Sequence, residues 1–285
     1  MVERIHRTLE LAHPPRAASI PAPAPLEPVA AANNGVAEAA RPDGSLTADT
    51  GRQLPVPRAR VVPLDREMLS ERRVILPDDT GAAAHAYRML RTQILRQART
   101  HKLKMIGVVS AVDGEGKTLT AVNLAFSLAA EPNQTALLVD LDLRQPGVAQ
   151  LLWLGAERGL DSWFVGETAL ADLFVRFEGI DRLRVLPTLN PVAGSSELLA
   201  GARAHELLAE LRNRYADRLI IVDLPPVLLA DDFLTIAPQL DCVLLVVSEG
   251  RSRREDVSRM KELLGGVRVL GTVLNVSGES ERRSY

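Results

Sequence analysis

The feature that most constrains the fold is a glycine-rich turn between an apolar run and a helical pattern. Residues 105–110, MIGVVS, form a continuous apolar run typical of a buried strand, and residues 118–130 have the periodicity of a helix. Gly114 and Gly116 stand between them, directly before Lys117. Glycines let the backbone turn sharply and direct its N–H groups at one point, where the dipole of the next helix adds positive potential. The segment therefore predicts a phosphate site.

The connecting residues AVDGEGKT, 111–118, fit a phosphate-binding P-loop with Ala111 in place of the first glycine. In such a loop the lysine reaches the β- and γ-phosphates of a nucleotide, and the hydroxyl that follows binds Mg²⁺. The predicted nucleotide-binding residues are Asp113, Gly114, Glu115, Gly116, Lys117, Thr118 and Leu119. The alternative is a glycine turn that only joins a strand to a helix. A dinucleotide fingerprint does not fit, because no third glycine follows at the required spacing.

Three aspartates follow apolar runs elsewhere in the chain. Asp140 and Asp142 end the run ALLVDLD, and Asp223 ends the run LIIVD. Side chains two residues apart on a strand project from one face, so the first two carboxylates would repel each other without a cation between them. Ligands of open α/β sheets bind at the carboxyl ends of strands, so we expect these aspartates to converge with Lys117 and Thr118 on one Mg²⁺-bound nucleotide. For each aspartate alone, a helix or turn cap is the alternative.

Apolar runs and helical patterns alternate from about residue 81 onward. Strands are predicted at 105–110, 136–142, 183–187, 219–226, 242–248 and 267–275, and helices at 82–98, 118–130, 203–215 and 252–264. Val/Ile/Leu runs that alternate with helical patterns are typical of a parallel sheet covered on both faces. We therefore predict an α/β fold of the P-loop NTPase type over residues 78–276, with a mostly parallel central sheet and helices on both faces.

The two ends of the chain have a different composition. Residues 13–63 hold ten of the 18 prolines, in runs such as PAPAPLEPVAAANNG. Proline- and alanine-rich sequence without periodicity predicts a disordered linker. Residues 1–77 are therefore expected to form an N-terminal arm, a short helix over 1–12 followed by that linker, and 277–285 a flexible tail that carries Tyr285.

Composition also excludes several classes of function. The formal net charge of the 285 residues is −2, which provides no basic field for a nucleic-acid partner. No stretch approaches the roughly 18 apolar residues of a transmembrane helix, and the N-terminus lacks the apolar core of a signal peptide. If the protein works at a membrane, we expect a partner to take it there. Cys242, the one cysteine, is expected to pack within its apolar run.

The three motifs AVDGEGKT, VDLDLR and VDLPP together resemble those of the bacterial tyrosine kinases of capsule and exopolysaccharide export. That family carries a P-loop, a hydrophobic strand followed by D-x-D-x-R, and a hydrophobic strand followed by D-x-P-P. Further segments that resemble the family are AYRMLRTQI (86–94), NPVAGSSELL (190–199) and LGTVLN (270–275). The resemblance covers about residues 81–276, and residues 60–77 resemble the lead-in of exosortase-associated members. Partitioning-type relatives share the fold but carry a lysine where this chain has Val112.

The resemblance implies an ATP-dependent protein-tyrosine autokinase that regulates the chain length and export of exopolysaccharide or capsule. Mg²⁺ would be held by Thr118, Asp142 and Asp223, directly or through water. Asp140 would accept the proton of the tyrosine hydroxyl. Catalysis would come mostly from positioning and charge neutralisation, since a carboxylate is a weak base for a phenol.

Two further positions carry implied roles with open alternatives. Arg144 completes the implied catalytic set of Lys117, Asp140 and Asp142, where it would help with phosphate charge. Pairing with neighbouring carboxylates is its alternative. Asn275 matches the position where relatives contact adenine, and a turn residue at a strand end is its alternative.

The chain departs from the family pattern at two places. Relatives usually end in a cluster of tyrosines, whereas here the implied phosphoacceptor is Tyr285 alone, beside Arg282 and Arg283. The ring-forming motif of the family is E-x-x-R-x-x-R, in which His85 replaces the acid. A histidine cannot make the arginine-to-carboxylate contact between subunits, which argues against a ring formed by that route.

The implied partner is the cytoplasmic tail of a membrane polysaccharide copolymerase, which would place the chain at the inner membrane. The alternative function is an ATP-binding regulatory switch that associates with such a copolymerase and has no significant kinase activity. The P-loop, the aspartate motifs and Tyr285 favour the kinase. The missing tyrosine cluster and His85 favour the switch.

Overall fold

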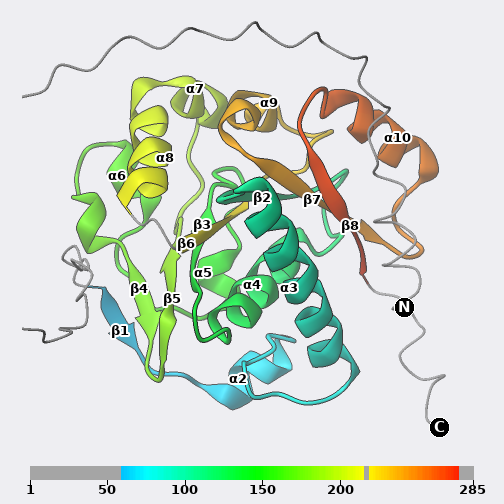
Figure 1. Ribbon diagram of the computed structural model, residues 1–285. Helices are drawn as coiled ribbons and strands as arrows, with labels where there is room; N and C mark the ends of the chain where they lie inside the picture. Colours follow the sequence, from blue (N-terminus) through cyan, green and yellow to red (C-terminus); the bar gives the residue numbers. More distant parts are fainter. Residues whose placement is uncertain (1–58, 215–217, 276–285) are drawn as a thin grey trace, which may run out of the picture. The chain divides into compact units, whose positions relative to one another are not determined.

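The structure, a computed structural model, describes residues 59–214 and 218–275 (Figure 1). The predicted helix over 1–12, the linker up to residue 58 and Tyr285 lie outside these ranges. The strands are β1 (Arg60–Val62), β2 (Met105–Ser110), β3 (Thr135–Asp140), β4 (Val175–Phe177), β5 (Ile180–Leu186), β6 (Arg218–Asp223), β7 (Cys242–Ser248) and β8 (Val269–Asn275). The helices are α2 (Arg66–Glu71), α3 (Ala82–His101), α4 (Lys117–Ala129), α5 (Val148–Leu151), α6 (Leu160–Phe164), α7 (Ser195–Ala200), α8 (Ala202–Arg214), α9 (Asp232–Ile236) and α10 (Arg254–Leu263), with 3₁₀ turns η1 (Leu170–Asp172) and η2 (Ala237–Gln239).

The strands form one eight-stranded sheet in the order β1-β4-β5-β3-β6-β2-β7-β8. The six strands from β5 to β8 in this order are parallel to their neighbours. β4 runs antiparallel to β5, and β1 pairs parallel to β4 at the edge of the sheet. The prediction of a mostly parallel sheet is confirmed, while the antiparallel pair β4–β5 was not predicted.

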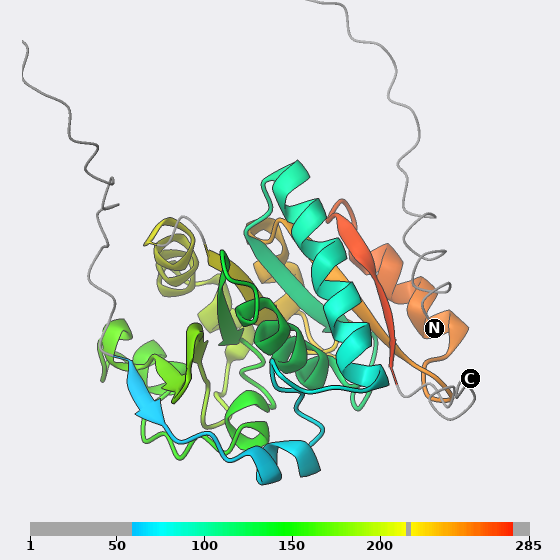
Figure 2. The same cartoon turned by 60° about the horizontal axis from the view of Figure 1, so that its bottom comes forward.

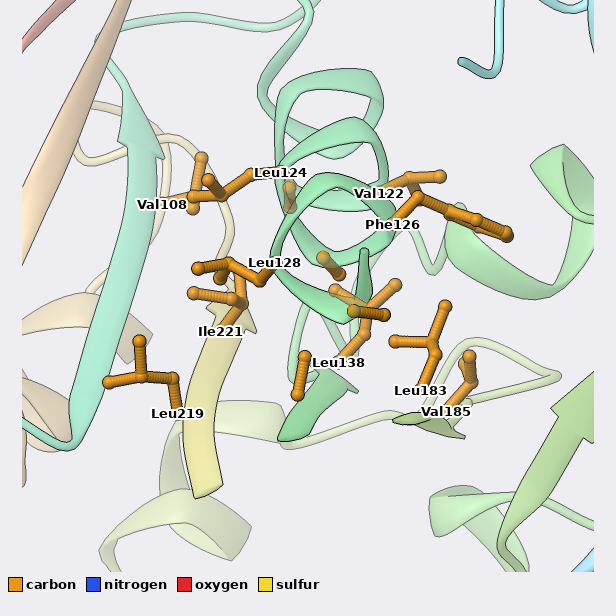
Figure 3. Close-up of a cluster of buried hydrophobic side chains, with 14 of the residues drawn as sticks. Val108, Val122, Leu124, Phe126, Leu128, Leu138, Leu183, Val185, Leu219 and Ile221 are labelled. Carbon is orange, nitrogen blue, oxygen red and sulfur yellow. The ribbon is translucent and has the colours of Figure 1, made fainter. Parts of the chain in front are cut away.

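Helices cover both faces of the sheet, as the apolar runs predicted (Figure 2). One core lies under α2, α3, α4 and α5, and the other under α6, α8, α9 and α10. Figure 3 shows the first core, in which Phe126 and Leu128 of α4 lie over Leu138 and Ile221 of the central strands. Because both faces are buried, the strands carry apolar residues at almost every position instead of alternating with polar ones.

The packed unit begins earlier than the predicted boundary at residue 77. β1 pairs with β4, and Leu69 of α2 is fully buried in the first core. The buried Asn123 of α4 fastens the segment that follows: its amide donates to the Arg73 carbonyl at 3.0 Å and accepts from the Ile75 N–H at 2.8 Å. Residues 60–77 are therefore part of the sheet and its cover and not part of a free arm.

Two smaller expectations have direct structural answers. Cys242 is a free thiol and fully buried, as its apolar run predicted. Among the helices of the described ranges, none combines the length and the apolar character needed to span a membrane.

Candidate active site

The predicted site residues meet at the carboxyl edge of the sheet. The loop 111–116 leaves the end of β2 and enters α4, which begins at Lys117. β6 lies between β2 and β3, so the P-loop and both aspartate motifs end on three neighbouring strands. Asp140 and Asp223 are the paired last residues of β3 and β6. This is the edge at which open α/β sheets bind ligands.

The loop has the backbone geometry of a phosphate cradle. Gly114 has φ of 74° and Gly116 has φ of 88°, both in the left-handed region that favours glycine. Gly116 is the N-cap of α4 and makes no side-chain capping bond. The first N–H groups of a helix have no intrahelical acceptor, so those of α4 are free to bind an anion at this end.

Glu115 points into the protein and not toward a ligand. Its side chain is fully buried and accepts hydrogen bonds from the N–H groups of Ala111 at 2.8 Å and Val112 at 3.1 Å. Its other oxygen accepts from the Ser252 hydroxyl in the loop between β7 and α10. Glu115 was predicted among the nucleotide-binding residues, and the structure leaves only its backbone available for that part.

Two more contacts hold the loop from the side of β7 and β8. The Arg251 guanidinium donates to the Gly114 carbonyl at 3.0 Å, and the Asn275 amide donates to the Glu115 carbonyl at 3.1 Å. Asn275 was predicted to contact adenine, and that role stays a prediction, since here its amide is bound to the loop. Arg251 and Ser252 were not predicted, because no local motif marks residues that bind a loop more than 130 positions away.

Lys117 forms the central ion pair of the site. Its Nζ lies 2.6 Å from Asp142 Oδ2, and both side chains are almost completely buried. Burial alone would lower the pKa of Lys117, but the negative charges of Asp223, Asp142 and Asp140 outweigh it and raise this pKa. The lysine therefore stays charged in the interior, as a residue that binds phosphate requires.

Thr118 and Asp223 form the second pair. The Thr118 hydroxyl donates to Asp223 Oδ2 at 2.7 Å, while Asp223 Oδ1 is buried without a hydrogen-bond partner in the described ranges. Burial raises the pKa of Asp223 to about 6, even though Lys117 and the Thr118 hydroxyl act in the opposite direction. An unsatisfied buried carboxylate oxygen beside a P-loop hydroxyl is a suitable ligand for a hard cation such as Mg²⁺.

Asp140 holds the segment that follows its strand. Its Oδ2 accepts from the N–H groups of Gly147 and Val148 at 3.1 and 3.0 Å, and its Oδ1 accepts from the Asp142 N–H at 3.2 Å. The side chain has no exposed surface, and burial, together with the charge of Asp223, raises its pKa well above the ordinary value. In this conformation Asp140 presents no surface to a tyrosine hydroxyl.

The residues at this edge fit a Mg²⁺–nucleotide, although they do not form a complete metal cage. No group of three His, Cys, Asp or Glu side chains within 59–214 and 218–275 is placed to hold a metal ion. Mg²⁺ in phosphoryl-transfer sites is usually bound by one or two protein oxygens, phosphate oxygens and waters. Thr118, Asp142 and Asp223 could serve as such protein oxygens, and Lys117 with the loop N–H groups could neutralise the charge of the phosphates.

Arg144 lies in a separate polar network. Its guanidinium donates to Asp231 and Asp232, each at 2.8 Å, and to the hydroxyls of Ser195 at 3.2 Å and Ser196 at 3.0 Å. The hydrogen bond to Asp232 is the main reason that the pKa of Arg144 is raised. The alternative of carboxylate pairing is thus observed, with partners on and next to α9 that the sequence did not indicate. A role in catalysis stays a prediction.

The remaining predicted residues have simple positions. Asp113 is exposed at the tip of the loop, and Leu119 is half-buried against the first core. His85 is exposed on α3. Arg88 donates to the Asp79 carbonyl at 2.9 Å, and Arg91 donates to the Ser127 carbonyl at 3.0 Å. The two arginines of the ring motif are thus bound within their own chain.

Comparison with known proteins identifies the family. The chain is 30% identical to tyrosine-protein kinase YwqD of Bacillus subtilis over 215 aligned residues. The alignment covers 74% of this chain and 89% of YwqD. The chain belongs to the bacterial tyrosine kinases. Tyrosine-protein kinase CpsD of Streptococcus agalactiae is also 30% identical, over 68% of this chain and 83% of its own length. These relatives confirm the resemblance to kinases of capsule and exopolysaccharide biosynthesis; membership of the exosortase-associated branch stays a prediction. No protein-family profile matches the chain.

Solved structures agree with this family. The kinase domain of VpsO superposes with a TM-score of 0.60 at 30% identity, over 68% of this chain and 95% of that domain. The kinase domain of the Escherichia coli tyrosine kinase Etk gives a TM-score of 0.64 at 25% identity, over 79% of this chain and 91% of that one. The division protein MinD of Pyrococcus horikoshii, solved with Mg-ADP, shares the fold with a TM-score of 0.50 at 24% identity, over 64% of this chain and 74% of that one. The predicted P-loop NTPase fold is confirmed.

Proposed function

We propose that the chain is an ATP-dependent protein-tyrosine autokinase that regulates the chain length and export of an exopolysaccharide or capsule. One observation carries the proposal: in a member of the kinase family, Lys117 and Thr118 of the P-loop contact Asp142 and Asp223 at the carboxyl edge of the sheet. A glycine turn that only connects a strand to a helix has no reason to gather a buried lysine and buried carboxylates.

The side chains suggest a division of labour in the transfer. Lys117 and the N–H groups at the start of α4 would bind and orient the phosphates of ATP. Mg²⁺, held by Thr118, Asp142 and Asp223, would neutralise charge on the β- and γ-phosphate oxygens. Transfer breaks the bond from the γ-phosphorus to the bridging oxygen of ADP and forms a bond to the tyrosine Oη, which loses its proton. Asp140 is our candidate acceptor for that proton, after the 140–148 segment opens.

We also propose that a separate membrane protein is the partner. The chain is 28% identical to the succinoglycan biosynthesis transport protein ExoP of Rhizobium meliloti over 75% of this chain, but it spans only 27% of ExoP. ExoP is by its name a transport protein of succinoglycan biosynthesis, which supports a partner from polysaccharide export. The cytoplasmic tail of a membrane polysaccharide copolymerase would hold the kinase at the inner membrane.

A second function is favoured by the helix α3. Its ring-motif arginines donate to carbonyls of their own chain and His85 replaces the acid, which argues against the contact expected to bring one subunit to another. Without that contact the chain would bind and hydrolyse ATP as a switch on the copolymerase and would not transfer phosphate to tyrosine at a significant rate.

Mass spectrometry of the chain co-expressed with its neighbouring copolymerase separates the two functions. The kinase predicts phosphate on Tyr285 in the wild type, none in Lys117→Met, and none in Tyr285→Phe. Phosphotyrosine that persists at full level in Tyr285→Phe would overturn the assignment of the acceptor. ATP binding without any phosphotyrosine would leave the switch as the function.

A further inference from the structure

The segments that carry the two aspartate motifs are joined to each other at two places. At the ends of their strands, the Leu141 N–H donates to the Asp223 carbonyl at 2.9 Å. Further out, Arg144, two residues after Asp142, forms an ion pair with Asp232 at the start of α9. The candidate Mg²⁺ ligands Asp142 and Asp223 therefore lie on two segments that are tied both at the sheet and beyond it.

Asp232 is the buried half of the outer tie. Its side chain has no exposed surface, whereas 44% of the Arg144 side chain is exposed. Asp232 Oδ1 accepts from Arg144 Nε at 3.1 Å and from Nη2 at 2.8 Å, and Oδ2 is buried without a hydrogen-bond partner in the described ranges. Within those ranges Arg144 is the one cation paired with Asp232. A buried carboxylate is costly without its cation, so moving Arg144 to a phosphate would be unfavourable.

The same guanidinium also holds the start of α7. Arg144 Nε donates to Ser195 Oγ at 3.2 Å, and Nη2 donates to Ser196 Oγ at 3.0 Å. Ser196 Oγ lies 2.8 Å from Asp232 Oδ1, within hydrogen-bond distance, and α7 packs against α9 (Figure 1). The planar fork of an arginine can bind several acceptors in a fixed geometry. Arg144 thus fixes the segment after Asp142 to two helices at once.

We propose that Arg144 and Asp232 are positioning residues, which set the spacing of the two aspartate segments for Mg²⁺, and that Arg144 does not itself bind phosphate. The inference rests on the Mg²⁺–nucleotide site of the proposed function. Asp142 Oδ2 contacts Lys117, and Asp142 Oδ1 accepts from the Gln145 N–H at 3.0 Å, so the orientation of this carboxylate depends on the segment that Arg144 holds. Groups that orient a metal ligand from behind affect metal affinity strongly. Loss of the pair should therefore weaken Mg²⁺ binding and leave Mg²⁺-independent nucleotide binding intact.

Binding of a fluorescent ATP analogue to the full chain, titrated with Mg²⁺ and repeated in EDTA, tests the proposal. The variant combines Arg144→Gln with Asp232→Asn, which removes both charges and leaves no buried carboxylate without its cation. We expect the Mg²⁺ concentration for half-maximal enhancement of binding to rise about tenfold, while affinity in EDTA stays within about twofold of the wild type. The matched control combines Arg176→Gln with Asp181→Asn, a more exposed ion pair of 3.1 Å on β4 and β5, and its Mg²⁺ requirement should not change.

The outcomes separate positioning from phosphate binding. A Mg²⁺ requirement equal to that of the control variant would overturn the proposal. Binding weakened equally with Mg²⁺ and in EDTA would make Arg144 a phosphate ligand and would also overturn it. If the wild type binds the analogue no better with Mg²⁺ than in EDTA, the Mg²⁺–nucleotide site of the proposed function fails, and the inference fails with it.

A milder variant covers the case in which the double variant does not fold. Asp232→Asn alone keeps a carbonyl oxygen for Arg144 and loses only the charge assistance of the hydrogen bonds. It should raise the Mg²⁺ requirement by a smaller factor, about threefold, with unchanged affinity in EDTA. A Mg²⁺ requirement equal to that of the wild type would overturn the proposal here as well.

Discussion

Glu115 offers the sharpest test of how the nucleotide loop is held. The carboxylate is fully buried and satisfies the N–H groups of Ala111 and Val112 and the hydroxyl of Ser252. Glu115→Ala removes the acceptor and leaves these donors unpaired in the interior. Each buried donor left without a partner costs roughly 1–3 kcal/mol. We therefore expect Glu115→Ala to lower the unfolding free energy by about 2–5 kcal/mol.

The conservative substitution Glu115→Gln should lower the unfolding free energy by less than Glu115→Ala does. Glu115→Gln keeps one carbonyl oxygen for the two N–H groups, and the Ser252 hydroxyl can turn to accept from the new amide. Only the charge assistance is lost, so we expect a loss of about 1 kcal/mol. Nucleotide affinity should fall with both variants, and more with alanine, because the loop loses its brace to the β7–α10 connection.

Urea unfolding followed by tryptophan fluorescence measures the stability, and a fluorescent ATP analogue measures the affinity. The control is Asp113→Ala, an exposed acid in the same loop, whose unfolding free energy should stay within about 0.5 kcal/mol of the wild type. If Glu115→Ala unfolds at the same urea concentration as the wild type, this side chain does not stabilise the loop. Glu115 would then again be a candidate for contact with the nucleotide.

Three further predictions follow from the same geometry. The pKa of Asp223 is about 6 in the folded chain and near 3.8 otherwise, so its contribution to stability is complete below about pH 4 and is lost as pH rises through 6. At about 1.4 kcal/mol per pKa unit, this pKa difference is worth roughly 3 kcal/mol of unfolding free energy. Asp223→Asn should remove this pH dependence from urea titrations of the nucleotide-free protein. An unfolding free energy that changes with pH as in the wild type would contradict the prediction. Gly116→Ala would place a Cβ 1.9 Å from the Asn275 amide at a φ of 88°, so we expect at least tenfold weaker ATP binding by calorimetry, and wild-type affinity would contradict the geometry. Asn123→Ala removes both bonds to the 73–75 segment and should cost about 2 kcal/mol of unfolding free energy with faster amide exchange at Ile75, whereas unchanged exchange would mean that the segment is held by apolar packing alone.

Local patterns were sufficient for the central strands and for the main contacts of the site. Asp140 and Asp223 each end an apolar run, and ends of adjacent parallel strands must lie together, so their pairing in the register follows from topology alone. Lys117 and Thr118 are placed by the loop and the helix that follows it. The fold class and the gathering of these side chains could therefore be predicted from the sequence.

The parts that escaped prediction depend on contacts between distant residues. β1 has only three residues, too few to show a period, and is defined by its pairing with β4 more than 100 positions away. Glu115 looks like a loop residue until Ser252 gives its carboxylate an internal partner. Arg144 is a plausible phosphate ligand until Asp231 and Asp232 are seen beside it. A polar side chain has several possible partners, and only the tertiary structure selects among them.

Arg88 and Arg91 form hydrogen bonds within their own chain, and this affects how the rate of phosphorylation should depend on protein concentration. A chain whose subunits are not joined in a ring meets its acceptor only by collision, so the rate of phosphorylation between copies should grow with the square of the chain concentration. Stable rings would instead give a first-order rate. A membrane partner that confines many copies to one surface would then act as an accelerator simply by crowding them, without altering a single contact in the site.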